Sequence, residues 1–245
     1  MQKEIEILEG AFVVADAHYS DERPLFLDFL KEIHSGALRP TQLILMGDIF
    51  DALFGEIPYT HEVNKEAIKL INEISNKMEV IYLEGNHDFN LASLFLNIKT
   101  FPISSQPLTC RYKDKKIILA HGDIEGAPLY KVYTKIIRNH YVLLILRALD
   151  TLLNNGILKR LDRYLSQKDD CREFIGLKSF MTKRLSNKYS CDYFVEGHFH
   201  QNKMINMRDF IYINLGAFAC NQRYFIVKST DNIELVEEKI FSKGI

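Results

Sequence analysis

The chain has 245 residues, of which 47% are hydrophobic and 26% are charged, the ordinary composition of a folded globular protein. That length accommodates one large domain, or one domain with an elaborated insert. The formal net charge of −1 gives no overall reason to expect nucleic acid as a partner.

Short apolar runs alternate with amphipathic segments through the first 122 residues. Strands that alternate with helices predict an α/β sheet with helices packed on it. We expect buried strands at 11–15, 43–46 and 80–83, helices at 22–34 and 61–77, and a further strand at 116–120 paired with 108–112.

The pattern changes at about 125, and helix periodicity then continues to about 190 without a convincing strand. Short β-like runs return at 192–195, 210–214, 224–227 and 233–237. No internal repeat or low-complexity linker divides the chain. We therefore predict a single domain over 1–245 with a helical insert at about 125–190.

The insert is basic and partly apolar. From Glu125 to Ser190 there are 13 Lys and Arg against 6 Asp and Glu, a net charge of +7, which leaves −8 for the remainder. This asymmetry indicates either an anionic partner, such as a phosphorylated substrate or an anionic lipid surface, or a solvated helical face. Residues 141–149 read YVLLILRAL, which is too short to span a bilayer. This stretch is a buried core helix, a lining for acyl chains or a helix at a membrane interface.

Four cysteines, at 110, 171, 191 and 220, show neither CxxC pairs nor a framework spacing. This pattern predicts free thiols in a reducing compartment. We expect no signal peptide, because no basic segment followed by an apolar one and a small-residue cleavage site opens the chain. No stretch reaches the roughly 18 apolar residues of a membrane span, so a cytoplasmic protein is predicted.

Acidic and imidazole side chains follow five of the expected strands within a few residues. Loops at the carboxyl ends of strands in an α/β sheet converge along one edge. One such cluster alone is typical of a turn or cap, but five together predict a shared site. The clusters are Asp16-Ala17-His18, Gly47-Asp48-Ile49-Phe50-Asp51, Gly85-Asn86-His87-Asp88, His121-Gly122-Asp123 and Gly197-His198-Phe199-His200.

The residue types in these clusters favour a dinuclear metal site. Two cations held close together need a bridging carboxylate, with imidazoles and an amide oxygen to complete their shells. Asp, His and Asn without thiolates suit Mn²⁺, Fe²⁺ or Zn²⁺ in a hydrolytic site. Glycine beside each cluster lets the backbone turn and approach the metals closely. Such a pair of metals predicts hydrolysis of a phosphate ester or anhydride.

The motifs DxH, GDxxD, GNHD, His-Gly and GHxH, in this order over residues 16 to 200, resemble the calcineurin-like metallophosphoesterase superfamily. The resemblance implies a β-sandwich flanked by helices (α/β/β/α), here with the insert as a lid. It also implies two divalent metal ions, Mn²⁺ in the first place and Fe²⁺ or Zn²⁺ as alternatives. One metal would be held by Asp16, His18, Asp48 and His200, and the other by Asp48, Asn86, His121 and His198, with Asp48 bridging.

The same resemblance implies that His87 is not a ligand but a catalytic residue that contacts the substrate phosphate or leaving oxygen. Asp51 would be its partner, because an acid commonly orients a functional histidine. Asn86, His87 and His198 are also expected to contact the substrate. Asp88 is expected to fix its own loop.

One subfamily is especially similar: the UDP-2,3-diacylglucosamine pyrophosphatases of lipid A synthesis. The shared features are His-Gly-Asp, a basic apolar helical insert, GHxH, and a Leu-Gly-Ala-aromatic segment, here Leu215-Gly216-Ala217-Phe218. The resemblance implies that metal-activated water cleaves the pyrophosphate bond, giving UMP and 2,3-diacylglucosamine 1-phosphate. The implied partners are a lipid-linked nucleotide and the cytoplasmic face of the inner membrane, where the protein would bind peripherally.

Three residues depart from what is usual in that subfamily: His87 replaces arginine, Phe199 replaces threonine and Phe218 replaces tryptophan. Two alternatives therefore stay open. One is a soluble phosphodiesterase or phosphatase that acts on another substrate, and the other is a non-catalytic scaffold of the superfamily. The sequence predicts neither the acyl-chain preference nor the oligomeric state.

Overall fold

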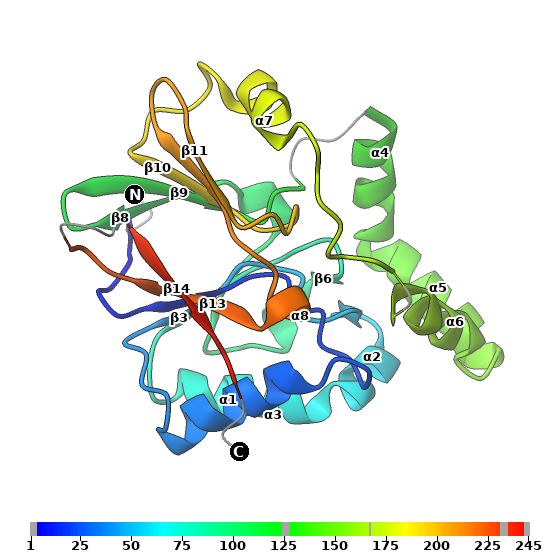
Figure 1. The fold of residues 1–245 in the computed structure, drawn as a ribbon. Helices are drawn as coiled ribbons and strands as arrows, with labels where there is room; N and C mark the ends of the chain where they lie inside the picture. The colour runs from blue at the N-terminus through cyan, green and yellow to red at the C-terminus, as the bar shows by residue number, and fades with distance from the viewer. Residues whose placement is uncertain (1–3, 124–127, 167, 231–234, 243–245) are drawn as a thin grey trace.

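Two stacked β-sheets with helices on both outer faces make up the body of the protein (Figure 1). This computed structural model describes residues 4–123, 128–166, 168–230 and 235–242. The architecture is the α/β/β/α sandwich expected from the sequence, so the predicted fold class is confirmed.

Each sheet has six strands among the described residues. The first sheet has the spatial order β1 (Ile5–Glu6), β8 (Leu108–Tyr112), β9 (Lys115–Ala120), β10 (Tyr193–Glu196), β12 (Ile211–Asn214) and β11 (Lys203–Asn206). The second has the order β14 (Val236–Ile240), β13 (Arg223–Val227), β2 (Phe12–Val14), β3 (Leu43–Leu45), β5 (Val80–Leu83) and β7 (Lys99–Phe101). A separate pair contains β4 (Leu53–Phe54) and β6 (Asp88–Phe89).

The central strands of the second sheet are apolar throughout because both of their faces are buried. Val13, Ile44 and Ile81 face the first sheet, whereas their neighbours Val14 and Leu45 face the covering helices. Side chains alternate between the two faces of a strand, so a strand between two apolar layers reads as a continuous apolar run. In this sheet β2, β3 and β5 run parallel, as β9 and β10 do in the other.

Helices α1 (Leu25–Ser35) and α3 (Lys65–Ser75) cover the second sheet (Figure 1). The single helix expected at 61–77 is in fact two, because α2 (Pro58–Val63) ends at Asn64. The Asn64 side-chain amide donates to the main-chain oxygens of Ala52 and Thr60 and fixes this break. The helix expected at 22–34 begins at Leu25, after Pro24 at its N-cap.

The short elements were not predicted from the sequence. They are β1, β4, β6, β7, β11, the 3₁₀ turns η1 (Leu91–Ser93) and η2 (Ile103–Ser105), and helix α8 (Phe218–Asn221). The last strand, expected at 233–237, is β14 at Val236–Ile240, and residues 233 and 234 lie outside the described residues.

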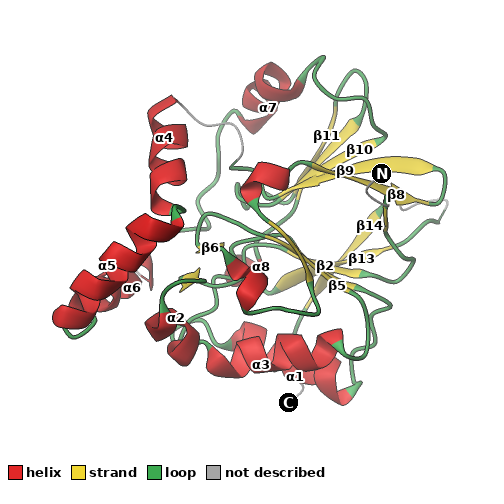
Figure 2. Cartoon of the chain, turned by 180° about the vertical axis from the view of Figure 1, so that it is seen from behind, coloured by secondary structure: helices red, strands yellow, loops and turns green. Residues whose placement is uncertain are grey.

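The expected insert is helical, and its helices divide between two places. Helices α4 (Pro128–Ile137), α5 (His140–Leu152) and α6 (Gly156–Ser166) extend from one side of the body, as both views show (Figures 1 and 2). Helix α7 (Leu177–Leu185) packs instead on the outer face of the first sheet, against Phe194 and Tyr212. The start of the insert at 125–127 lies outside the described residues. The single-domain organisation stays a prediction.

Helix α5 is not a core helix, so that reading of residues 141–149 was wrong. Only Leu143 and Asp150 of this helix are buried. Tyr141, Ile145 and Leu149, spaced four residues apart, are 74%, 62% and 49% exposed and form an outward apolar stripe. Within the described ranges no one helix has both the length and the apolarity to cross a membrane. Helices α5 and α6 meet those criteria only as a pair, bent by 103°.

Cys171 and Cys220 form a disulfide with a Cα–Cα distance of 5.6 Å. The expectation of four free thiols was therefore wrong for this pair, and the inference of a reducing compartment loses its support from the cysteine pattern. The two cysteines are 49 positions apart in the chain, so no local spacing reveals the bond. Cys110 and Cys191 are free.

Candidate metal centre

The five polar clusters meet at one edge of the sandwich, where the parallel strands end. Carboxyl ends of parallel strands share an edge, so residues far apart in sequence become neighbours. The loop after β2 contains Asp16 and His18, the loop after β3 contains Asp48 and Asp51, and the loop after β5 contains Asn86 and His87. In the other sheet, the loop after β9 contains His121 and the loop after β10 contains His198 and His200.

The first group of possible ligands contains Asp16, His18 and His200, whose donor atoms all lie within 4.8 Å of one another. His200 Nε2 is 3.2 Å from Asp16 Oδ1. His18 Nε2 is buried and has no hydrogen-bond partner among the described residues. A buried polar atom without a partner is unusual in a folded protein, and a cation between these side chains would satisfy it.

The second group contains Asp48, His121 and His198, also within 4.8 Å of one another. His121 Nε2 lies 3.4 Å from Asp48 Oδ2 and 3.2 Å from the amide oxygen of Asn86. The two groups adjoin, since the backbone N–H of His198 donates to both carboxylate oxygens of Asp16 at 2.9–3.0 Å. Six of the seven expected ligands therefore lie in two neighbouring groups, with Asp48 in the second, and Asn86 contacts the second group through His121.

The imidazoles are oriented through their Nδ1 atoms. A main-chain carbonyl oxygen or an ionised carboxylate oxygen only accepts, so an Nδ1 bound to it carries the hydrogen and leaves Nε2 with the lone pair that binds a metal. The oxygen partners are Asp51 Oδ1 at 3.0 Å for His18, Met46 O at 2.9 Å for His121 and Asp170 O at 2.5 Å for His200.

The electrostatics of the site also fit divalent cations. Burial would raise the pKa of Asp48, but the nearby imidazoles, His121 foremost, hold it well below its ordinary value. Burial, and then the charge of His121, lowers the pKa of His198 to about 4, so this imidazole is neutral at pH 7. Against burial, Asp16 raises the pKa of His200 to about 9, and a metal would take that proton's place. Ionised carboxylates and neutral imidazoles are the forms that bind metals.

Several of these ligands have a strained backbone conformation. Five of the seven expected ligands have a positive φ, a region that non-glycine residues rarely adopt: Asp16, His18, Asp48, His198 and His200, between 45° and 61°. Gly85 is required for space, because a Cβ there would lie 2.2 Å from Asp48 Oδ1. Such strain clusters at functional sites, where the surrounding structure holds it in place.

His87 lies beside the first group, with its ring 5.0 Å from that of His18. Its Nδ1 donates to the main-chain oxygen of Asp51 at 2.9 Å, so Nε2 is the atom left for a substrate. The Asp51 carboxylate itself binds His18, and the ligand atoms of His18, Asp51 and His87 also lie within 4.8 Å of one another. Asp51 thus orients both imidazoles, one through its carboxylate and one through its backbone.

Asp88 fixes the GNHD loop, as expected. Its Oδ1 accepts from the backbone N–H groups of Asp48 and Gly85, and its Oδ2 accepts from Ile49 N and from the Tyr82 hydroxyl at 2.6 Å. The carboxylate therefore joins the loop after β3 to the loop after β5.

Arg138, at the end of α4, connects the insert to the second group. Its Nη2 lies 2.9 Å from both Gly85 O and Asp123 Oδ2, and its guanidinium is 5.4 Å from the ring of Phe89. A cleft of about 680 Å³ adjoins this contact and is lined in part by Arg138, Lys135, Glu84 and Asp123. The insert therefore borders the second group with a cleft that contains both acidic and basic side chains.

Arg184 of α7 contacts residues next to the ligands of the second group. Its Nη1 donates to Gly122 O at 2.9 Å, and its Nη2 pairs with the buried carboxylate of Glu196, which also accepts from the Tyr212 hydroxyl. Its guanidinium lies 5.3 Å from the ring of Phe199. Arg184 thus anchors the loops that follow β9 and β10.

Sequence reasoning missed Arg138, Asp170 and Arg184, because each makes its contacts through a main-chain oxygen or with a side chain distant in the chain. Only Arg184 gave a usable signal. It shares a helical face with Leu177 and Met181, at spacings of seven and three residues, and a cation on an apolar face requires a buried partner.

The chain resembles known proteins over most of its length. The profile of the calcineurin-like phosphoesterase family matches residues 11–202. The chain is similar to a UDP-2,3-diacylglucosamine hydrolase from Blochmanniella pennsylvanica, 26% identical over 77% of this chain and 78% of that protein. It is also similar to one from Haemophilus influenzae, 21% identical over 87% and 92%. Among solved structures, the phosphoesterase Yfce from E. coli aligns over 95% of this chain and 99% of that one, at 13% identity and a TM-score of 0.48.

Proposed function

The chain belongs to the calcineurin-like phosphoesterase family, and we propose that it hydrolyses the pyrophosphate bond of UDP-2,3-diacylglucosamine. The products are UMP and 2,3-diacylglucosamine 1-phosphate. The observation that carries this substrate is the insert, because it contacts the residues around both groups of ligands and also carries exposed apolar side chains. Relatives that bear the name of this hydrolase support the same choice.

Two divalent metal ions belong to this reaction, and we expect Mn²⁺ at both positions. Asp16, His18, Asp48 and His200 would hold one ion, and Asp48, Asn86, His121 and His198 the other, with Asp48 shared. When bound, such ions polarise phosphoryl oxygens and lower the pKa of water. Oxygen and imidazole ligands without thiolates suit Mn²⁺, with Fe²⁺ and Zn²⁺ as the alternatives.

The chain's own residues then orient the pyrophosphate. His87, fixed at Nδ1 by Asp51 O, presents Nε2 to a phosphoryl or leaving oxygen. In its cationic form it donates a hydrogen bond there and offsets the charge that develops as the P–O bond breaks. Asn86 and His198 contact the same phosphate from the second group.

The insert provides the surface for a lipid and for the membrane that contains it. Leu129, Val132 and Ile136 of α4 are 84%, 56% and 53% exposed, as the stripe on the following helix α5 is. Exposed apolar area of this extent marks an interaction site. The exposed cations Arg147 of α5 and Lys159 and Arg160 of α6 match anionic headgroups. We infer peripheral binding at the cytoplasmic face of the inner membrane.

The test is release of UMP from UDP-2,3-diacylglucosamine by the purified chain with Mn²⁺ in detergent micelles. UDP-N-acetylglucosamine, which has the same pyrophosphate without acyl chains, is the matched substrate control. We expect rapid release only from the acylated nucleotide and none from the Asp48→Ala protein. Rapid cleavage of simple phosphodiesters with no UMP release would overturn the proposal.

That outcome would favour the alternative, a phosphodiesterase or phosphatase for another substrate. One residue favours it: His87 is a general phosphate-contacting group where the similar subfamily usually has arginine. Activity that requires detergent or lipid would count against this alternative.

A further inference from the structure

The segment that returns from α6 to α7 reaches the first group of ligands at Asp170. The main-chain oxygen of Asp170 accepts from His200 Nδ1 at 2.5 Å. Its side chain is buried, at 3% exposure, and Oδ2 accepts from Arg23 Nη1 at 2.8 Å. Arg23 comes from the loop before α1, so this ion pair joins the insert to the body of the protein.

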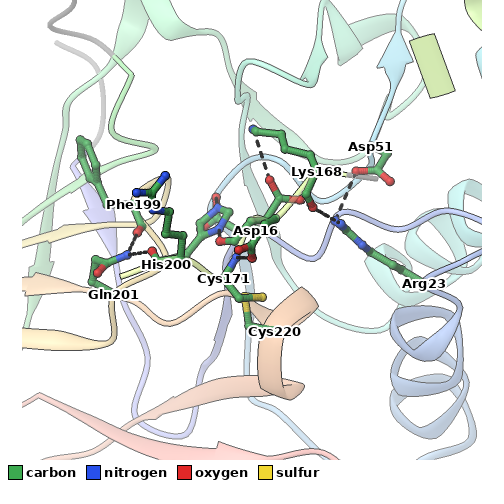
Figure 3. The surroundings of a disulfide bond; sticks show 12 residues. Asp16, Arg23, Asp51, Lys168, Cys171, Phe199, His200, Gln201 and Cys220 are labelled. Carbon is green, nitrogen blue, oxygen red and sulfur yellow. Dashed lines mark hydrogen bonds and ion pairs between the residues drawn. A yellow bond between two sulfur atoms is a disulfide. The ribbon is translucent and has the colours of Figure 1, made fainter. Parts of the chain in front are cut away.

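Arg23 extends the same connection to the other imidazole of the group. Its Nη1 lies 3.7 Å from Asp51 Oδ1 (Figure 3). The same Asp51 oxygen is bound to His18 Nδ1 at 3.0 Å. The result is a continuous chain of contacts from His18 through Asp51, Arg23 and Asp170 to His200. Both imidazoles are therefore held at Nδ1 by one network, while each Nε2 belongs to the group around Asp16.

The Cys171–Cys220 disulfide adds a covalent bond to this network of contacts. Cys171, next to Asp170, is bonded to Cys220 in α8 (Figure 3). The backbone N–H groups of Phe218 and Ala219, in the same helix, donate to the main-chain oxygens of Ala15 and Asp16 at 3.0 and 3.1 Å. One covalent bond thus connects the segment that orients His200 to the helix that holds Asp16.

We propose that Arg23 and Asp170 are positioning residues for the metal held by Asp16, His18 and His200, and that the Cys171–Cys220 disulfide makes its affinity depend on the thiol redox state. Partners of this kind orient ligand imidazoles, and their loss lowers metal affinity by about 10–100-fold. The proposal rests on the metal binding of the proposed function, not on its lipid substrate.

The redox step needs a dithiol reductant as the second reactant. Its thiolate attacks one sulfur of the Cys171–Cys220 bond, and its second thiol completes the exchange. The protein bond breaks, two electrons and two protons pass to Cys171 and Cys220, and the reductant becomes a cyclic disulfide. Cys171 is exposed and Cys220 half-buried, so the bond is open to attack.

The positioning test is calorimetric titration of the metal-free chain with Mn²⁺, for the wild type and for Arg23→Gln and Asp170→Asn. We expect two equivalents in the wild type. In both variants one equivalent should be unchanged and the other weakened by about 10–100-fold. Arg23→Lys, which keeps the charge, should restore part of the loss. Arg111→Gln, which breaks the remote pair with Glu4, is the matched control and should bind as the wild type does.

If Arg23→Gln and Asp170→Asn bound both equivalents of Mn²⁺ with wild-type affinity, the positioning role would be overturned. Equal weakening of Mn²⁺ binding at both equivalents would also overturn it. If either variant fails to give a native circular dichroism spectrum, the Arg23→Lys titration decides. Wild-type affinities in that milder variant would then contradict the proposal.

The redox part is tested by reducing the wild type with dithiothreitol, removing the reagent under anaerobic conditions and titrating again. We expect the same single equivalent of Mn²⁺ to bind more weakly to the reduced protein. The Cys171→Ser/Cys220→Ser variant should show the same weakening without reductant. Unchanged affinities in the reduced protein would overturn the redox dependence. Neither titration contains lipid or nucleotide. Two bound metals without UMP release would therefore contradict only the proposed substrate.

Discussion

His87 Nδ1 lies 2.9 Å from the main-chain oxygen of Asp51, while the carboxylate of the same Asp51 lies 3.0 Å from His18 Nδ1. One residue of the GDxxD motif therefore orients both a predicted metal ligand and the imidazole predicted to contact phosphate. Replacing the Asp51 side chain would disturb His18 first, so the role of His87 must be tested at His87 itself.

His87→Ala should keep both metals and lower kcat by about 10²–10⁴-fold, because it removes a proton-donating group and no ligand. Asp48→Ala should instead lose metal and activity together, since its carboxylate belongs to the second group. Metal content by plasma mass spectrometry, measured beside kcat, separates the two cases. Loss of both metals in the His87 protein would contradict its assignment.

Asp88→Ala should lower the free energy of unfolding by about 3–5 kcal/mol. It leaves the backbone N–H groups of Asp48, Ile49 and Phe50 without their acceptor, and each buried donor that is left unpaired costs about 1–3 kcal/mol. Tyr82→Phe is the control, because it removes only one donor to Asp88 and should cost about 1 kcal/mol. Urea unfolding of the metal-free chain measures both, and equal effects would refute this role for Asp88.

Arg184→Met should destabilise the fold by about 3–5 kcal/mol, because it leaves the Glu196 carboxylate buried without a cation. The double variant Arg184→Met/Glu196→Gln should recover most of this loss. Thermal unfolding of the four proteins of this mutant cycle is the measurement. Additive effects of the two substitutions would show that the pair does not interact.

The pH dependence of this variant has a definite sign. Burial raises the pKa of Glu196 to about 7, against the opposing charge of Arg184. An acid whose pKa is raised on folding contributes most below its unfolded pKa of about 4.5, and the contribution is lost as pH rises through the folded value. Removing Arg184 raises the folded pKa further. The loss of stability should therefore be larger at pH 8 than at pH 5, and the reverse order would contradict this cause.

The two free cysteines should react slowly with iodoacetamide in the native protein. Burial raises the pKa of Cys110 to about 12 and that of Cys191 to about 11, so at pH 8 about one Cys191 in a thousand is thiolate. The initial rate at Cys191 should rise about tenfold per pH unit from 8 to 10. Mass spectrometry of the denatured chain should show two alkylated cysteines before reduction and four after it. Four before reduction would exclude the disulfide.

The exposed stripe of α5 should bind anionic vesicles. Ile145→Glu/Leu149→Glu should weaken cosedimentation with phosphatidylglycerol vesicles more than tenfold, because burying each such side chain contributes about 1.5–3 kcal/mol. Leu96→Glu is the control, since Leu96 is 83% exposed but lies outside the insert. Equal loss in both proteins would show that added charge alone, and not this stripe, decides binding.

The sequence predicted the central strands well, because strands such as 80–83 are buried on both faces and read as apolar runs. It failed for β4 and α8, which have two and four residues and no periodic pattern that would reveal them. The sequence predicted a single helix at 61–77 because helix periodicity continues across Asn64. In the structure, hydrogen bonds from the Asn64 side chain to Ala52 and Thr60 end the first helix there.

The sequence by itself determined which side chains meet in the site, since motifs at the carboxyl ends of parallel strands must share an edge. Only the tertiary structure decided how they are oriented. Asp170, Arg184 and the Cys171–Cys220 bond act on partners distant in the chain or on main-chain oxygens, and such contacts leave no local pattern. The tertiary structure also decided the exposure of α5. A helix that is apolar nearly all round is buried or exposed according to how the rest of the chain packs against it.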